Sequence, residues 1–164
     1  MKRSYKLAGL ITLIVVALDQ ATKAWILANI VLYTTHPVIP GFFNIVHVLN
    51  KGAAFGFLNR SDITWQTYLF FASTALAVVL ILHLLRAAPE KDVLLVAALG
   101  LILGGAAGNL IDRIRFGEVV DFLDFYWGTL HWPAFNVADI AISLGSVGLI
   151  AAFLRARKTP SDEK

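Results

Sequence analysis

The sequence predicts an all-α membrane protein, in which four transmembrane helices carry a small extracytoplasmic β element. Three observations predict this class. The 164-residue chain is 58% hydrophobic and only 15% charged, whereas about a quarter of the residues in a soluble domain are charged. The apolar residues gather in four long stretches. Lys and Arg flank those stretches on the sides that the positive-inside rule assigns to the cytoplasm.

The four apolar stretches define the predicted helices. A helix needs about 20 residues to cross a bilayer core, and the first three stretches are long enough. The fourth reaches that length if its helix begins close to Asn136. We therefore expect helices over approximately residues 7–32, 67–85, 93–112 and 137–154. Residues 1–164 then form a single integral-membrane domain.

Basic residues outside the helices predict the orientation. They precede the first helix, flank the link between the second and third, and follow the fourth: Lys2, Arg3, Lys6, Arg86, Lys91, Arg155, Arg157 and Lys158. Both termini should therefore lie in the cytoplasm, and residues 33–66 and 113–135 outside it. The net charge of +3 mostly reflects these anchors, so no nucleic-acid partner is expected. The first helix has no small-x-small cleavage site and should be retained.

A small β element is predicted in the outer segments. Residues 42–49 are rich in β-branched and aromatic side chains, which is typical of a strand, and residues 119–127 have a similar composition. Lys51-Gly52 fits a turn, with a short return segment over 53–58. Ser61 or Asp62 is a plausible N-cap for the second helix.

Polar residues inside the helices lie at similar depths. Counted at about 1.5 Å per residue from the inner helix ends, Asp19 lies about 18 Å up, Lys23 and Asn109 about 24 Å, and Asp139 about 22 Å. The hydrocarbon core is about 30 Å thick. The polar groups of three helices therefore form one layer in the outer third of the bilayer. Such groups are costly in a membrane and indicate a functional site.

Two aspartates in this region form the best candidate for chemistry. Asn136 can cap the fourth helix, whose dipole stabilises a charged Asp139 in its first turn. Asp121 lies between Val120 and Phe122, where desolvation should raise its pKa. Two carboxylates whose environments differ in this way are expected of a general base and a general acid.

Other polar residues have more than one interpretation. Asp19 and Lys23 are spaced as an ion pair on one helix face, and this structural role and direct catalysis stay open. Asp112 and Asp124 lie off the faces of the candidates and are expected to be solvated. Ser143 with Lys23 is a weak alternative nucleophile. With no cysteine and no ligand spacing among the four histidines, neither a metal nor another cofactor is expected.

Five short motifs, in order along the chain, resemble the lipoprotein signal peptidases, the type II signal peptidases of bacteria. The motifs are Asp19-Gln20-x-x-Lys23, Asn50-x-Gly52-Ala53-Ala54-Phe55, Gly105-x-x-x-Asn109-x-x-Asp112-Arg113, Val120-Asp121-Phe122 and Phe135-Asn136-x-Ala138-Asp139. Each motif alone is weak, but five together on a four-helix pattern of this length are highly specific.

The resemblance implies an aspartic endopeptidase of the bacterial cytoplasmic (inner) membrane, with its active site near the outer, periplasmic face. The positions matching the family's catalytic pair are Asp121 and Asp139. Those matching its supporting residues are Asp19, Lys23, Asn50, Gly52, Gly105, Asn109, Arg113, Asn136 and Ala138. The implied substrates are prolipoproteins bearing a diacylglyceryl group, cut just before the lipidated cysteine. Membrane lipids and inhibitors of the globomycin type are the other implied partners.

A small proton- or ion-coupled transporter is the alternative, because buried Asp, Lys, Arg and Asn also build relays. A relay needs polar groups through the whole membrane, whereas the inner halves of the first, third and fourth predicted helices carry no charge. The chain also shows no inverted repeat of the transporter type.

Overall fold

A computed structural model describes residues 2–52 and 65–157. In these residues the helices are α1 (Arg3–Asn29), α2 (Trp65–Ala87), α3 (Val93–Phe116) and α4 (Val137–Arg157). The strands β1 (Thr35–Ile39), β2 (Phe43–Asn50), β3 (Val119–Trp127) and β4 (Leu130–His131) form one antiparallel sheet in that order. All four helices are long and apolar enough to cross a membrane. The predicted fold class is therefore confirmed.

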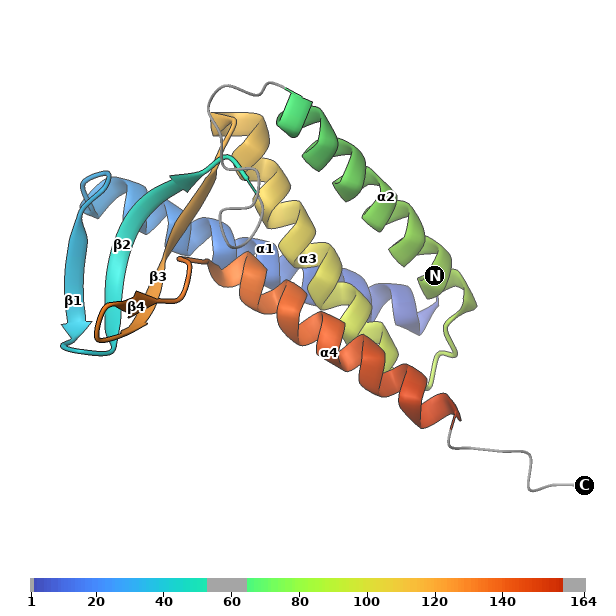
Figure 1. The fold of residues 1–164 in the computed structure, drawn as a ribbon. Coiled ribbons are helices and arrows are strands. Elements are labelled where there is room, and N and C mark those ends of the chain that lie inside the picture. Colours follow the sequence, from blue (N-terminus) through green and yellow to red (C-terminus); the bar gives the residue numbers. More distant parts are fainter. Residues whose placement is uncertain (1, 53–64, 158–164) are drawn as a thin grey trace, which may run out of the picture.

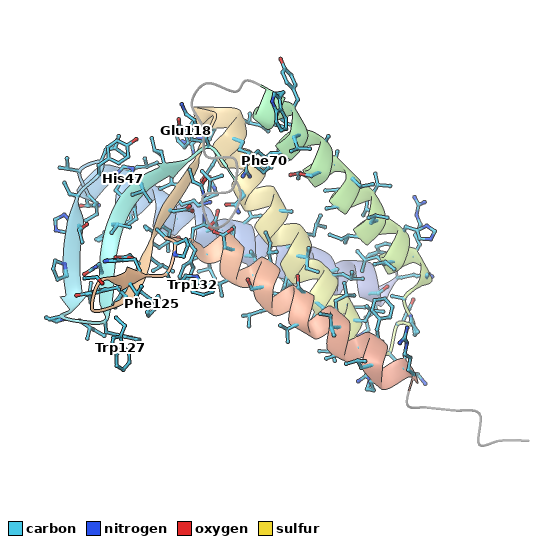
Figure 2. The ribbon with its side chains drawn as sticks, in the orientation of Figure 1. His47, Phe70, Glu118, Phe125, Trp127 and Trp132 are labelled. Atoms are coloured by element: carbon cyan, nitrogen blue, oxygen red, sulfur yellow. The ribbon has the colours of Figure 1, made fainter. Side chains whose placement is uncertain are left out.

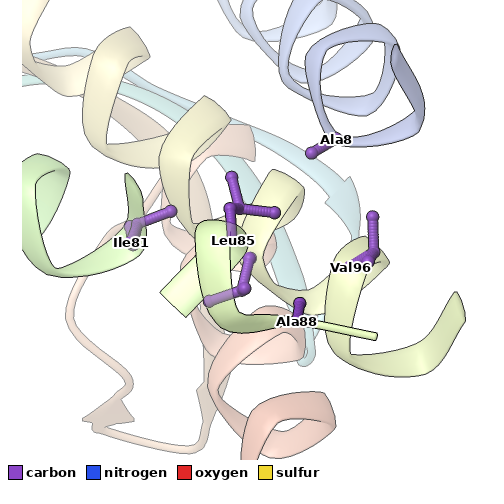
Figure 3. Packing of buried hydrophobic residues seen from close by; sticks show 6 residues of the cluster. Ala8, Ile81, Leu85, Ala88 and Val96 are labelled. Carbon is purple, nitrogen blue, oxygen red and sulfur yellow. The ribbon is translucent and has the colours of Figure 1, made fainter. Parts of the chain in front are cut away.

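The helices assemble around α3, which packs against each of the other three. Side chains from α1, α2 and α3 meet in an apolar cluster that includes Ala8, Leu85 and Val96 (Figure 3). Towards the other end of α3, glycines allow the neighbouring helices to approach closely. A Cβ on Gly104 would lie 2.7 Å from Val15 of α1, and one on Gly105 would overlap the Ala138 carbonyl oxygen of α4. The small residues of α3 therefore bring α1 and α4 together at the level of the polar layer.

The helix boundaries differ from the prediction by a few residues. The third helix was expected to end at residue 112 but continues to Phe116, where Gly117 caps it in the left-handed conformation at φ 76°. This additional turn places Arg113 on α3 and not in the outer segment. The first helix was expected to reach residue 32 but ends at Asn29. The chain then turns through Tyr33, whose φ of 60° does not continue a helix.

The sheet lies at one end of the helices, whereas the start of α1 and the end of α4 lie at the other (Figure 1). The predicted strands over 42–49 and 119–127 correspond to β2 and β3, whereas β1 and β4 were not predicted. The expected return segment over 53–58 and the expected N-cap at Ser61 or Asp62 fall outside the described residues. In β3, Val120 and Phe122 pack with Ile26 of α1. Because side chains alternate along a strand, Asp121 points to the opposite face.

Candidate active site

A cavity of about 350 Å³ lies where the sheet meets α3 and α4. Its polar lining includes residues from β2, α3, β3 and α4 and one residue just after β2: Asn50, Asn109, Arg113, Asp121, Asp139 and Gly52. Trp132, which also lines the cavity, lies close to the N-terminal end of α4 (Figure 2). Ile140 and Leu144 form an apolar part of the wall, and they are 38% and 59% exposed on the outside of α4. The cavity therefore joins a polar region to the surface that α4 presents to lipid.

The beginning of α4 fixes the position of Asp139. The Asn136 side-chain oxygen accepts the backbone N–H of Asp139 at 3.0 Å, and the Asp139 Oδ2 accepts the backbone N–H of Asn136 at 3.2 Å. This is a reciprocal capping box, with aspartate in the position usually held by Glu or Gln. Because the first four N–H groups of a helix have no partner within it, the two bonds of the capping box stabilise the start of the helix and also orient the carboxylate.

Asp121 reaches the same cavity from the sheet. Its two carboxylate oxygens accept hydrogen bonds from the Nδ2 atoms of Asn136 at 2.7 Å and Asn50 at 2.9 Å. Asn136 thus touches both aspartates. Burial raises the pKa of Asp121 to about 7, and the charge of Asp139 adds to the rise, while the two amides oppose it. The expectation that desolvation would raise the pKa of Asp121 agrees with this environment.

The side-chain amides at the cavity are held in one orientation. The oxygens of Asn136 and Asn50 accept backbone N–H groups, from Asp139 and Gly52 respectively. The Asn109 oxygen accepts from the Lys23 ammonium at 2.9 Å. Backbone N–H and ammonium groups only donate, so each amide must turn its NH2 group away from them. Asn109 therefore donates to Asp139 Oδ1 at 2.9 Å, as Asn50 and Asn136 donate to Asp121.

Lys23 lies behind the cavity in a fully buried network. Its ammonium contacts Asp19 at 2.9 Å, Asp112 at 2.8 Å and the Asn109 oxygen at 2.9 Å. These contacts use the three N–H bonds of an ammonium group. Lys23 therefore forms the ion pair that was one of its two interpretations, and its side-chain nitrogen is held as an ammonium by Asp19, Asp112 and Asn109 instead of accepting a proton from Ser143. The alternative Ser-Lys pair does not fit this geometry.

Two expectations were wrong. Asp112 was expected to be solvated but is only 1% exposed. It accepts the Lys23 ammonium, the Gln20 amide at 3.0 Å and the backbone N–H of Val120 at 3.1 Å. It therefore ties α3 to both α1 and β3. The spacing from Asn109 to Asp112 places both on one side of a helix, and this signal was available in the sequence.

Asp124 was likewise expected to be solvated but is 6% exposed. It accepts the Asn44 amide at 2.7 Å and contacts His131 Nδ1 at 2.9 Å. Asn44 is its cross-strand neighbour in the β2–β3 pairing, and cross-strand neighbours depend on a register that the single sequence did not reveal. Asp124 does not line the cavity.

The remaining supporting positions hold the elements together. Asp19 accepts the backbone N–H of Ala138 at 2.9 Å, which joins α1 to the first turn of α4. Ala138 is completely buried, and Gly105 and Gly108 lie against it. Arg113 donates to the carbonyl of Gly52 at 3.1 Å, and its guanidinium lies 4.6 Å from the centre of the Phe70 ring of α2.

Comparisons with known proteins agree with the motifs. A family described as Signal peptidase (SPase) II matches residues 11–155. The chain belongs to the signal peptidase II family. A lipoprotein signal peptidase of Maridesulfovibrio salexigens is 56% identical over 92% of this chain and 97% of its own. One from Nitratidesulfovibrio vulgaris is 53% identical over 98% and 94%. A solved bacterial membrane enzyme superimposes with a TM-score of 0.80 at 31% identity, over 96% of this chain and 93% of that one.

As a member of the signal peptidase II family, the protein is an aspartic peptidase. The predicted site residues of this peptidase fall into two groups. Asn50, Gly52, Asn109, Arg113, Asp121 and Asp139 line the cavity. The second group is buried and holds in place the elements that carry the first group: Asp19, Lys23, Gly105, Asn136 and Ala138. Gln20 belongs with the second group, since its amide contacts both Asp19 and Asp112.

Proposed function

We propose that this peptidase removes the signal peptide from diacylglyceryl-modified prolipoproteins by cutting just before the lipidated cysteine, and that Asp121 and Asp139 are its catalytic pair. Membership of the signal peptidase II family supports signal-peptide removal from prolipoproteins and does not favour a transporter. The observation that carries the choice of residues is the meeting of two aspartates, from β3 and α4, at one cavity beside a lipid-facing helix.

The different environments of the two carboxylates support distinct roles. Asp121, with its pKa raised to about 7, acts as the acid in its protonated form. Asp139 lies in the first turn of α4, where the helix dipole stabilises a charged carboxylate, and in its ionised form it acts as the base. Asp139 takes a proton from water while the water oxygen attacks the scissile carbonyl carbon, and Asp121 gives its proton to the carbonyl oxygen.

The tetrahedral intermediate then collapses. Asp139 passes its proton to the nitrogen of the leaving cysteine, the C–N bond breaks, and Asp121 recovers a proton from the intermediate's hydroxyl group. The net reaction consumes one water and leaves both carboxyl groups as they began. No covalent enzyme intermediate, metal or other cofactor takes part in this scheme.

The position of the cavity fits a substrate that is itself in the membrane. A signal peptide crosses the bilayer as a helix, and its lipidated cysteine lies close to the interface. The apolar wall of Ile140 and Leu144 is exposed on the outside of α4, so the signal peptide and the acyl chains of the lipidated cysteine reach the cavity sideways from the lipid. The sheet at the end of the helices then covers the polypeptide beyond the cut.

The supporting residues have two proposed tasks. Asn50, Asn109 and Asn136 orient the catalytic carboxylates through the hydrogen bonds already described. Arg113 has guanidinium N–H groups beside the cavity and holds a carbonyl group of the substrate backbone. Four further residues position the helices: Asp19, Lys23, Gly105 and Ala138. The carbonyl group of Gly52 holds the Arg113 side chain in place by accepting its hydrogen bond.

We assign the protein to the bacterial cytoplasmic membrane, with both termini in the cytoplasm and the sheet on the outer face. The basic residues at one end of the helices support this orientation. Lipids surround the exposed helix faces, and a cyclic peptide of the globomycin type is expected to occupy the cavity and block the substrate.

A cleavage assay tests the proposal. Purified protein in lipid is given a diacylglyceryl-modified prolipoprotein or its unlipidated form, and the product is followed by gel shift. The wild type should cut only the lipidated form, globomycin should stop it, and Asp121→Asn and Asp139→Asn should each lower the rate by at least about 10³-fold. Asp92→Asn, at the N-cap of α3, serves as the control. Cleavage that survives substitution of both aspartates would refute the assignment.

A further inference from the structure

Ser143 is a polar side chain that the proposed reaction leaves without a task. It lies on α4 four residues after Asp139 and lines the same cavity. Its side chain is exposed, between the lipid-facing residues Ile140 and Leu144. A rise of about 1.5 Å per residue places it about 6 Å from Asp139 along the helix, towards the middle of the bilayer.

The hydroxyl group of Ser143 has no hydrogen-bond partner in the described part of the chain. This differs from Ser146 on the same helix, whose hydroxyl donates to the carbonyl of Ile142 at 2.7 Å. Ser73 on α2 likewise donates to Phe70. Serines in helices often bond to their own backbone in this way. A polar group without a partner is costly beside lipid, so a hydroxyl kept free at a cavity wall points to a bond with a ligand.

The substrate provides a matching acceptor. The last four carbonyl groups of a helix have no partner within that helix. In a signal peptide these carbonyl groups lie close to the cleavage site, where there is little water. An extended chain advances about 3.3 Å per residue. A peptide with its scissile bond at Asp139 therefore places at Ser143 the carbonyl group about two residues before the bond that breaks.

We propose that Ser143 is a substrate-binding residue, whose hydroxyl donates a hydrogen bond to a backbone carbonyl on the signal-peptide side of the cut. This inference rests on the proposed function, because it places the scissile bond at Asp139. The contact is made equally before and during the reaction, so it contributes to binding and leaves the chemical step unchanged. Ser143 therefore binds the main chain of the signal peptide, and the contact does not depend on the side chains of that peptide.

Isosteric variants test this role. Ser143→Thr keeps a hydroxyl, Ser143→Val has the same shape without one, and Ser146→Ala on the same helix is the matched control. Initial rates are measured in lipid over a range of lipidated prolipoprotein. Ser143→Val should raise KM roughly three- to tenfold with kcat within twofold. Ser143→Thr and Ser146→Ala should match the wild type.

Each other result overturns the proposal in a recognisable way. If Ser143→Val and Ser143→Thr have the same KM while the wild type cuts normally, the hydroxyl binds nothing and only this inference fails. If Ser143→Val lowers kcat at unchanged KM, Ser143 acts in the chemical step instead. A folded wild type that does not cut the lipidated substrate would refute the proposed function together with the inference.

A modified substrate tests the partner atom. An ester in place of the amide two residues before the cut weakens that carbonyl as an acceptor. The wild type should lose more affinity for the ester than Ser143→Val does, because only the wild type has a bond there to weaken. Equal losses would overturn the choice of a main-chain carbonyl as the partner.

Discussion

Asn109 connects the buried ion network to Asp139 through the two ends of one amide. Its oxygen accepts from Lys23 and its nitrogen donates to Asp139. An amide is well suited to this position because it carries one acceptor and one donor group on the same planar frame. The orientation of Asp139, one of the two proposed catalytic carboxylates, thus depends on a lysine that does not reach the cavity.

Asn109→Asp tests this dependence with almost no change in shape. The new carboxylate still accepts from Lys23, but its second oxygen faces an oxygen of Asp139 where a donor stood. Cleavage should fall about 10²- to 10³-fold, as for other losses of a single positioned donor. Asn29→Asp, at an exposed position of α1, should change the rate less than twofold. A rate for Asn109→Asp close to the wild type would show that Asp139 does not need this amide.

The raised pKa of Asp121 predicts how activity depends on pH. Asp121 is protonated below about 7 and loses the proton that it should donate as the pH rises through that value. We therefore expect kcat/KM to fall about tenfold per pH unit on the alkaline side. Asn50→Ala removes a hydrogen bond that favours the ionised form, so it should move this decline to higher pH. Asn44→Ala, whose amide serves Asp124, should leave it in place.

The stability of the protein should also fall as the pH rises through the pKa of Asp121. Between the ordinary value of 3.8 and about 7, the folded protein keeps a proton on Asp121 that the unfolded chain has released. The contribution of Asp121 to the free energy of unfolding is therefore fully present below the lower value and falls as the pH rises across this range.

The pH dependence of activity has its own contradicting outcome. If Asn50→Ala moved the decline of kcat/KM to lower pH, the Asn50 hydrogen bond would not be favouring the ionised form of Asp121.

At the scale of elements, the contact of α3 with α4 fixes the position of the first turn of α4, which carries Asp139. Gly105 of α3 lies against the carbonyl oxygen of Ala138, the residue that precedes Asp139. A methyl group there must push the first turn of α4 away from α3. Gly105→Ala should therefore lower the stability by about 1–3 kcal/mol and the cleavage rate by more than tenfold.

Gly9→Ala is the matched control, because a Cβ on Gly9 of α1 would meet nothing within 4 Å. Thermal unfolding in detergent and the lipidated-substrate assay check both variants. Gly9→Ala should be at least as stable as the wild type, since alanine favours a helix more than glycine does. If Gly105→Ala had wild-type stability and activity, α4 would not need this close contact.

The elements and the candidate site were predictable to different extents. Hydropathy and length located four helices because each must cross a bilayer, and the motifs located Asp121 and Asp139. The burial of Asp112 and Asp124 was not predicted, because it depends on partners from other elements, Lys23 and Asn44. The strand β1 was also missed. It pairs as an edge strand with β2, contains a proline, and has exposed residues throughout, so its composition carries little signal.

For the whole molecule, orientation in the membrane can be measured directly, because the chain contains no cysteine. A single cysteine at Thr35 of β1 or Trp127 of β3 should react with a membrane-impermeant maleimide added to spheroplasts. One at Lys6 of α1 should react only after the membrane is permeabilised. These sites are exposed and away from the cavity. Labelling of Lys6→Cys in intact spheroplasts would reverse the proposed topology.

The bond between Asp19 and the backbone of Ala138 has a consequence for biosynthesis. It joins positions 119 residues apart, so the ribosome delivers the two halves of the site at different times. The first three helices and Asp121 emerge before the turn that carries Asp139. A nascent chain therefore has no carboxylate pair until its last transmembrane segment has entered the bilayer. If Asp121 and Asp139 are the catalytic pair, as proposed, unfinished copies at the translocon cannot cut the signal sequences that insert beside them.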